Sequence, residues 1–244
     1  MRYPLLDEIR GASMLSMLIY HGCWDLVYIF GLKAPWYESR GAYFWQQSIC
    51  WTFIFLSGFC WHLGKRKIRN GLKIFLGGAL ISLVTILFMP EDRVIFGVLT
   101  FLGSAALIIT FLDRYIKNIM PAAGFAFSML LFILTKGINQ GFLGFGPWKM
   151  QLPASLYKNL LTAYLGFPGP TFFSTDYFSI LPWIFLYLAG YYTYMWMEEK
   201  SELTVLKKSF CPPLGFMGRH SFLIYMIHQP VLYGILMLVS QFSK

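Results

Sequence analysis

A histidine and an aspartate four residues apart give the first apolar run of the sequence a pattern that could do chemistry. At this spacing His21 and Asp25 share one face of a helix, so the carboxylate can hydrogen-bond one ring nitrogen and leave the other free. A ring nitrogen held in this way is suited to accept a proton from a substrate. A core histidine satisfied by its neighbour is the structural alternative, but both residues in one apolar helix favour catalysis. We therefore predict that His21 is a general base or nucleophile and that Asp25 orients it.

A second histidine interrupts the last apolar run, in the segment His228-Gln229-Pro230. Pro230 would break a backbone hydrogen bond and open a local gap in the helix wall. His21 lies about 16 Å along its helix from Arg10, and His228 lies about 14 Å along its helix from Arg219. The two histidines are therefore predicted at similar depth in the membrane. Kinks of this kind also occur for structural reasons alone. We predict that His228 supports catalysis and that Gln229 contacts the substrate.

Basic residues stand at the cytoplasmic ends of the same two runs. Arg10 is three residues from Asp7 on one helix face, so the pair is either an ion pair that fixes the helix end or an anchor for an anionic ligand. Arg219 and His220 begin the last run, where Arg219 could hold a phosphate or a headgroup. These positions predict binding of an anion that enters from the cytoplasm.

Other polar residues are candidates for substrate contact. Gln46 lies in the second apolar run, where hydrogen bonding between helices is the structural alternative. Asp176 precedes the sixth run, beside Tyr177 and close to Trp183, and could cap that helix or contact a polar substrate at its outer mouth. The four cysteines show no CxxC spacing and no metal-ligand cluster is evident, so no metal is predicted.

The composition shows which elements must position these residues. Of 244 residues, 57% are hydrophobic, 19% aromatic and only 13% charged, which excludes a disordered chain, a collagen, a disulfide scaffold and a soluble α/β enzyme. We predict an all-α integral membrane protein, a bundle of about seven transmembrane helices in a single domain over residues 1–244. The predicted crossings are Glu8–Gly31, Gly41–Leu63, Leu72–Met89, Arg93–Leu112, Ile119–Thr135, Tyr177–Met197 and Phe216–Phe242.

The distribution of charge predicts the orientation. The sequence has 20 Lys and Arg against 11 Asp and Glu, a formal net charge of +9. In a membrane protein this excess is explained by basic cytoplasmic loops rather than by binding of nucleic acid. Basic residues gather in the N-terminal segment, which includes Arg2, and after the second, fourth and sixth runs. The N-terminus is therefore predicted inside and the C-terminus outside. An eighth crossing within residues 136–176 would spoil this pattern, and the apolar stretch 152–167 is left as a loop, a surface helix or a re-entrant helix.

Taken together, the motifs resemble the heparan-α-glucosaminide N-acetyltransferase catalytic-domain-like proteins, a bacterial family within the transmembrane acyltransferase superfamily. The resemblance covers nearly the whole chain, because its blocks run in order from the first helix to the last. The blocks are Leu6-Asp7-x-x-Arg10-Gly11, Tyr20-His21-x-x-x-Asp25-Leu26, Phe55-Leu56-Ser57-Gly58, Phe96-Gly97-Val98-Leu99, Asp176-Tyr177-Phe178, Leu181-Pro182-Trp183 and Gly218-Arg219-His220-Ser221-Phe222-x-x-Tyr225-x-x-His228-Gln229-Pro230.

The resemblance implies transfer of an acyl group, in this family acetyl, from cytosolic acetyl-CoA to an amine or hydroxyl of a sugar-like or envelope acceptor. It implies His21 as the catalytic residue, because the first-helix histidine of the wider superfamily is thought to be essential. It also implies a set of basic residues that hold the CoA phosphates: Arg10, Lys65, Arg66, Arg69, Arg219 and His220. Thr100 departs from the family, since many bacterial members have a histidine there.

Two rival functions stay open at this point. The same polar residues could serve a small proton-coupled transporter or flippase, or could secure packing in a non-catalytic membrane subunit. The predicted partners are acyl-CoA, the acceptor and membrane lipid, and the predicted location is the cell membrane, crossed several times. The sequence leaves open the acceptor, the acyl length, an acyl-histidine intermediate and the oligomeric state, for which a homodimer is one option.

Overall fold

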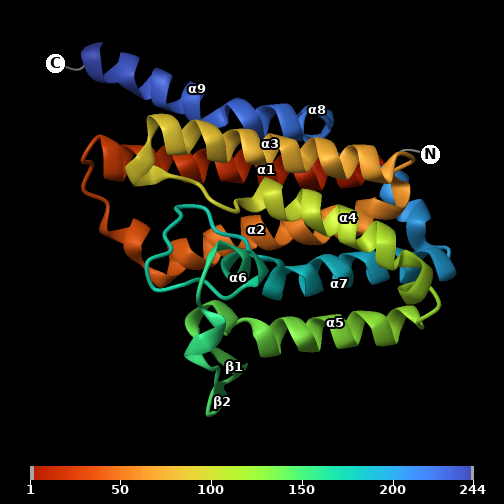
Figure 1. Cartoon of the computed structure of the whole chain (residues 1–244). Coiled ribbons are helices and arrows are strands. Elements are labelled where there is room, and N and C mark those ends of the chain that lie inside the picture. The colour runs from red at the N-terminus through yellow and green to blue at the C-terminus, as the bar shows by residue number, and fades with distance from the viewer. Residues whose placement is uncertain (1–2, 243–244) are drawn as a thin grey trace. The chain divides into compact units, whose positions relative to one another are not determined.

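The computed structural model describes residues 3–242, and helices make up most of this part of the chain. The chain folds into two compact units, and Figure 1 labels the helices and strands of which they are made. One unit contains both ends of the chain, residues 1–53 and 201–244, and the other contains residues 54–200. Each unit is described separately below. We refer to them as the terminal unit and the central unit.

The terminal unit is built around the first and the last helices. Helix α1 (Pro4–Trp24) continues into a single π-helical turn (Asp25–Ile29). After a short 3-10 turn α2 (Arg40–Cys60) follows, of which residues 40–53 belong to this unit. The unit is completed by α8 (Pro212–Arg219) and α9 (Ser221–Phe242). Helix α1 packs along both α8 and α9, so segments about 200 residues apart in sequence form one layer.

Two glycines allow α1 and α8 to pack closely. A Cβ atom on Gly11 would lie 1.9 Å from the carbonyl oxygen of Leu214, and one on Gly218 would lie 1.8 Å from the carbonyl oxygen of Asp7. No side chain fits at either position, because real non-bonded contacts are longer. Small residues that let helix backbones approach are typical of helix packing in membranes.

The central unit contains the remaining long helices. Helices α3 (Lys67–Phe88) and α4 (Val98–Ile116) pack against each other, and so do α5 (Pro121–Thr135) and α7 (Ile180–Glu199). Between α5 and α7 the chain forms an antiparallel hairpin of β1 (Phe142–Phe145) and β2 (Trp148–Gln151), in which Phe142 pairs with Gln151. The short helix α6 (Leu160–Leu165) follows the hairpin.

The helices agree with the predicted membrane class, and each predicted apolar run contains a helix. Four described segments are long and apolar enough to cross a bilayer: Lys67–Phe88, Val98–Ile116, Pro121–Gln140 and Ser221–Gln241. Helices α1, α2 and α7 are of similar length but are not among these four segments. Seven crossings and the orientation of the termini stay predictions. Arg2, on which the predicted orientation partly depends, lies outside the described residues.

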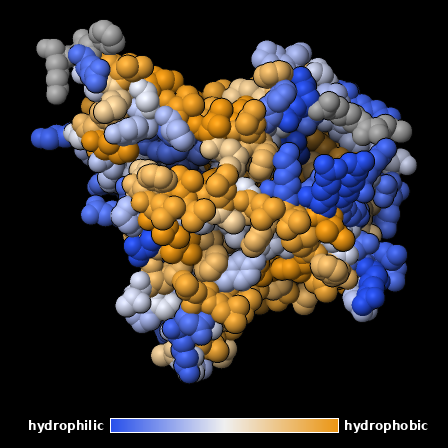
Figure 2. All heavy atoms as spheres, turned by 45° about the horizontal axis from the view of Figure 1, so that its top comes forward, coloured by the Kyte–Doolittle hydropathy of each residue, from blue (hydrophilic) through white to orange (hydrophobic). Residues whose placement is uncertain are grey.

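An exposed apolar surface on α3 supports contact with lipid. Apolar side chains cover much of the surface in Figure 2. On α3, large apolar residues recur every three to four positions and more than 40% of each is exposed. These residues are Leu72, Leu76, Leu80, Leu83, Leu87 and Phe88. A soluble protein would bury such a stripe, so this face of α3 is suited to hydrocarbon.

The long segment before α7 contains no helix that could cross a membrane, as far as the described residues show. Its α-helix, α6, has six residues, and the rest is hairpin, short 3-10 turns and loop. Six residues extend about 9 Å, whereas the hydrocarbon layer is about 30 Å thick. The apolar stretch 152–167 therefore forms a short helix flanked by loops.

Candidate active site

Two histidines from the first and last helices lie side by side in the terminal unit. The ring centroids of His21 on α1 and His228 on α9 are 4.9 Å apart, and the rings meet edge to face at 64°. His228 is buried, with 9% of its surface exposed, whereas His21 is half-buried. The structure thus brings together the two histidines that the helical rise places at similar depth.

Asp25, four residues after His21, and Gln229, directly after His228, add an acid and an amide to this pair. The Nε2 group of Gln229 donates a hydrogen bond to Oδ1 of Asp25, and Asp25 is fully buried. The spacing of the sequence predicts instead a bond from Asp25 to His21, and the structure gives Asp25 the amide as its partner. The acid is therefore held by a residue of α9. We call His21, Asp25, His228 and Gln229 the histidine cluster.

The hydrogen bonding of His228 indicates which of its nitrogens is free. Its Nδ1 lies 2.6 Å from the carbonyl oxygen of Tyr225, and a carbonyl can only accept, so Nδ1 carries the proton. The other nitrogen, Nε2, is buried and has no partner among the described residues. This leaves Nε2 with a lone pair that can accept a proton from a bound group.

The cluster holds further polar atoms without a partner. Oδ2 of Asp25 and Oε1 of Gln229 are buried and, within residues 3–242, accept no hydrogen bond. Buried polar atoms are nearly always paired in proteins, because an unpaired one costs about 1–3 kcal/mol. Three such atoms in one small region therefore indicate a place where water or a polar substrate group binds.

Irregular helix geometry accompanies the cluster on both helices. Asp25 begins the π-helical turn, in which the N–H of Phe30 bonds the carbonyl of Asp25 at 3.0 Å. Pro230 lies inside α9 directly after Gln229 and lacks the N–H that a regular helix would use. π-Turns occur frequently at functional sites. Both irregularities occur where the side chains of the cluster meet.

Aromatic residues frame the cluster on the side of α2. Tyr20 packs against Tyr37 and Trp45, with ring centroids 5.1 and 5.2 Å away, and the hydroxyl of Tyr37 donates to the carbonyl of Tyr20. Burial raises the pKa of Tyr37, so its phenol stays protonated and donates. The predicted substrate residue Gln46 is half-buried on α2, and no hydrogen bond of its side chain is found among the described residues.

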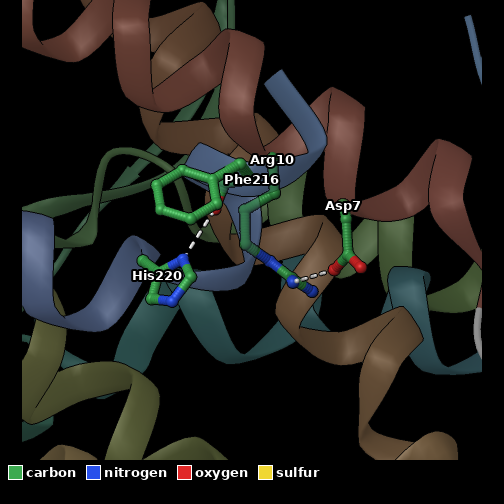
Figure 3. Close-up of polar contacts among 4 residues, drawn as sticks. All are labelled: Asp7, Arg10, Phe216 and His220. Atoms are coloured by element: carbon green, nitrogen blue, oxygen red, sulfur yellow. Dashed lines mark hydrogen bonds and ion pairs between the residues drawn. The ribbon is translucent and has the colours of Figure 1, made fainter. Parts of the chain in front are cut away.

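Arg10, Arg219 and His220 of the terminal unit lie at helix ends that the sequence predicts to face the cytoplasm. Arg10 pairs with Asp7 at 3.1 Å, and Nδ1 of His220 contacts the carbonyl of Phe216 at 2.9 Å (Figure 3). Of the two alternatives for Asp7 and Arg10, the ion pair is thus observed, and phosphate binding by Arg10 stays a prediction. Arg219 is exposed, with its guanidinium 5.8 Å above the ring of Phe216.

The other predicted anchors belong to the central unit. Lys65, Arg66 and Arg69 are exposed at the start of α3. Exposed basic side chains at a helix end suit binding of a phosphate group, and equally a solvated cytoplasmic loop. The predicted set of phosphate-binding residues is thus divided between the two units.

Asp176 has a structural role that the sequence does not predict. Its Oδ2 accepts the N–H of Val98 at 3.1 Å, so the carboxylate caps α4 rather than α7, the helix that follows Asp176 in the chain. The carbonyl of Phe96, which has a positive φ of 57°, accepts the N–H of Phe178 at 2.8 Å. Two motif blocks about 80 residues apart in the sequence therefore lie together in the central unit.

The other two predicted substrate residues of the central unit also make structural contacts. The hydroxyl of Tyr177 donates to the carbonyl of Ala163. Trp183 packs against Phe132 and Phe178, with ring centroids 5.6 and 5.0 Å away. These contacts hold both aromatic side chains in defined positions near the start of α7.

One comparison with known proteins gives a match. A family model described as "Heparan-alpha-glucosaminide N-acetyltransferase, catalytic" matches residues 2–230, which is nearly the whole chain and includes every residue of the histidine cluster. No curated protein and no solved structure matches the chain.

Proposed function

We propose that this chain, which belongs to the heparan-alpha-glucosaminide N-acetyltransferase catalytic family, is a membrane-embedded acyltransferase. It moves an acyl group, by the family's activity an acetyl group, from cytosolic acyl-CoA to an amine or hydroxyl of a sugar-like or envelope acceptor. The single observation that carries the chemistry is the histidine cluster, with its three buried polar atoms that lack a partner. The two compact units work as one domain in this proposal, since the family model spans both.

In the proposed reaction a histidine removes the proton that the acceptor loses. The acceptor nitrogen or oxygen attacks the thioester carbonyl, a new carbon–nitrogen or carbon–oxygen bond forms, and the carbon–sulfur bond breaks. The proton passes to the histidine and then to the leaving thiolate of CoA. His21 is the proposed base or nucleophile, and Nε2 of His228 supports it at a ring distance of 4.9 Å.

The buried acid supports this proton transfer through charge. Asp25 is held by Gln229, and a carboxylate in this position favours the protonated form of a nearby imidazole. Gln46 and the free carbonyl oxygen of Gln229 are the proposed contacts for the acceptor within the terminal unit. In the central unit we propose Asp176, Tyr177 and Trp183 for the same purpose.

The basic residues are proposed to hold the CoA phosphates. Arg219 is exposed and, in the part of the chain that the structure describes, no carboxylate pairs with it, so its guanidinium is available for a phosphate. Arg10 lies on α1, and His220 directly follows α8, which packs against α1 (Figure 3). The proposed anchors of the central unit are Lys65, Arg66 and Arg69.

The test is acetyl transfer by the purified protein in proteoliposomes. Radiolabelled acetyl-CoA is supplied on one side, glucosamine is supplied on the other, and labelled N-acetyl product and free CoA thiol are counted together. We expect both to form in equal amounts. Movement of glucosamine without release of thiol would identify a carrier instead, and failure to bind acetyl-CoA at all would overturn the acyltransferase.

A further inference from the structure

The β1–β2 hairpin of the central unit has one apolar face and one mixed face. Successive side chains of a strand point to opposite faces, and residues paired across an antiparallel ladder share a face. Four large apolar side chains therefore lie on one face of the hairpin. They form the pairs Leu143–Met150 and Phe145–Trp148. The pairs Phe142–Gln151 and Gly144–Lys149 lie on the other, mixed face. We call the first of these the apolar face of the hairpin.

The apolar face is the one that the central unit leaves uncovered. The exposed fraction is 79% for Trp148, 61% for Met150 and 54% for Phe145. A half-buried antiparallel pair in water shows the opposite arrangement, with its apolar side chains on the core and its polar side chains outward. An exposed cluster of this kind indicates contact with another molecule or with a membrane.

The mixed face packs on the protein instead. An added Cβ atom on Gly137, just after α5, would lie 2.1 Å from the ring of Phe142, so that ring lies directly against the backbone. The ammonium of Lys149 lies 4.4 Å from the centroid of the same ring. These contacts fix the hairpin to the end of α5 and direct its apolar face away from that contact.

The hairpin follows a segment that is long and apolar enough to cross a bilayer. This segment, Pro121–Gln140, has 20 residues. At 1.5 Å per residue it extends about 30 Å, which is the thickness of the hydrocarbon layer. Strand β1 begins at Phe142 and packs against α5 (Figure 1). The hairpin therefore lies at the level where hydrocarbon gives way to lipid headgroups.

The residues of the hairpin suit that level of the membrane. Tryptophan is enriched at the boundary between headgroups and acyl chains, and lysine keeps its ammonium in the polar layer. Trp148 and Lys149 are neighbours on β2, so their side chains point to opposite faces. Backbone N–H and C=O groups at the two outer edges of a hairpin need water or headgroups, which excludes burial of the whole hairpin in hydrocarbon.

We propose that this hairpin is a membrane-interface anchor, whose apolar face lies on the phospholipid layer that α5 crosses. The side chains of Phe145, Trp148 and Met150 reach the boundary with the acyl chains, and Lys149 faces the water side. The partner is the acyl boundary of a phospholipid bilayer rather than one particular headgroup. The anchor uses none of the residues of the proposed reaction, so the inference stands independently of acyl transfer.

The test locates single side chains of the hairpin in a bilayer. The full-length protein, with its natural cysteines replaced by serine, is placed in phosphatidylcholine nanodiscs with one nitroxide label at a time. The labels are attached through Trp148→Cys, Lys149→Cys, Met150→Cys and Gln151→Cys. Power saturation in electron paramagnetic resonance then compares collisions with oxygen, which dissolves in hydrocarbon, and with a water-soluble nickel chelate. Circular dichroism checks that each variant keeps its helices.

The ratio of oxygen to nickel collisions should alternate along β2. We expect it to be several-fold higher at positions 148 and 150 than at positions 149 and 151, because the first two belong to the apolar face. Equal access of the nickel chelate to all four labels would place the hairpin in water and overturn the proposal. Protection of position 148 from both reagents would show that protein covers the apolar face, which also overturns it. Spectral broadening between labels would identify that protein as a second copy.

A pair of charge substitutions gives an independent readout. Trp148→Asp puts a carboxylate at the boundary with the acyl chains, whereas Gln151→Asp puts the same group on the mixed face of the same strand. In nanodiscs the midpoint of thermal unfolding should be lower for Trp148→Asp than for Gln151→Asp. Trp148→Tyr, which keeps an aromatic ring with a polar group, should unfold close to the unmodified protein. Equal midpoints for the two aspartate variants would contradict the anchor.

Discussion

The side-chain amide of Gln229 donates a hydrogen bond to the buried carboxylate of Asp25, and this bond joins the proline-interrupted part of α9 to the π-turn that follows α1. The bond holds Gln229, which directly follows His228, next to Asp25, which lies four positions after His21. The two histidines are thereby fixed in edge-to-face contact at 4.9 Å. The amide–carboxylate bond is the link between the two halves of the histidine cluster.

Substitutions of this pair should separate the hydrogen bond from the charge. In Asp25→Asn the amide of Gln229 can still donate to the new carbonyl, so we expect nearly unchanged thermal unfolding and loss of acetyl transfer. Gln229→Leu leaves the buried carboxylate without its donor and should destabilise the protein by about 1–3 kcal/mol. The measurements are unfolding followed by tryptophan fluorescence and the kcat for acetyl transfer. A more stable Gln229→Leu than Asp25→Asn would contradict the role of the bond.

The two histidines should be needed for chemistry and not for the binding of acyl-CoA. General acid–base catalysis contributes about 10²–10⁴-fold, so we expect His21→Ala and His228→Ala each to lower kcat by at least about 100-fold. Acetyl-CoA binding, measured by calorimetry, should change little. His62→Phe is the control, because its ring lies between Tyr191 and Tyr194 in the central unit and a phenyl ring can replace it there. Full activity of either alanine variant would refute its proposed role.

The close contact of α1 with α8 should not tolerate a methyl group. Gly218→Ala would place a Cβ atom 1.8 Å from the carbonyl oxygen of Asp7, so the helices must move apart. We expect a loss of about 1–3 kcal/mol or more, measured as a lower midpoint of thermal unfolding in detergent. Gly234→Ala on α9 is the matched control, because an added Cβ there meets no atom within 4 Å. If both variants unfold at the same temperature, the close packing has no energetic consequence.

The sequence predicts the helices better than their ends. The apolar run that begins at Arg93 becomes helical only at Val98, because residues 93–96 hydrogen-bond to the segment 174–178 instead. The run 216–242 is divided into α8 and α9 at His220, whose φ of −102° and ψ of 13° are not helical. Both differences arise from contacts or backbone angles that hydrophobicity does not encode.

The same limit applies to the candidate site. Helical rise predicts His21 and His228 at similar depth, and the structure brings them together. The i,i+4 rule assigns Asp25 to His21 because it considers only one helix, whereas the structure pairs the acid with an amide on another. The sequence likewise does not predict that Asp176 caps α4, because this cap depends on a contact between segments about 80 residues apart.

Removing the Asp176 cap should lower the stability of the protein even when no sugar substrate is bound. Asp176→Ala takes away the acceptor for the N–H of Val98 at the start of α4, which should cost about 0.5–2 kcal/mol. Asp176→Asn keeps an oxygen acceptor and should recover most of this loss. Thermal unfolding without substrate tests the cap. If only the acceptor's KM changes and the unfolding temperature does not, Asp176 contacts the substrate without supporting the fold.

The number of crossings can be decided by the side of the membrane on which two lysines lie. With seven crossings, Lys117 after α4 and Lys207 after α7 both face the cytoplasm, whereas an eighth crossing within residues 136–176 would put them on opposite sides. Single cysteines are introduced as Lys117→Cys, Lys207→Cys and Ser155→Cys, after serine has replaced the natural cysteines: Cys23, Cys50, Cys60 and Cys211.

A membrane-impermeant maleimide then reports the side of each cysteine in intact and lysed cells. We expect the Ser155→Cys variant to react in intact cells, because the segment 136–176 faces outward in the seven-crossing arrangement. The Lys117→Cys and Lys207→Cys variants should react only after lysis. Labelling of Lys207→Cys in intact cells, with Lys117→Cys still protected, would require an additional crossing between α5 and α7. It would also move the proposed anchors Arg219 and His220 to the side away from cytosolic acyl-CoA, so the same experiment tests the proposed binding of the donor.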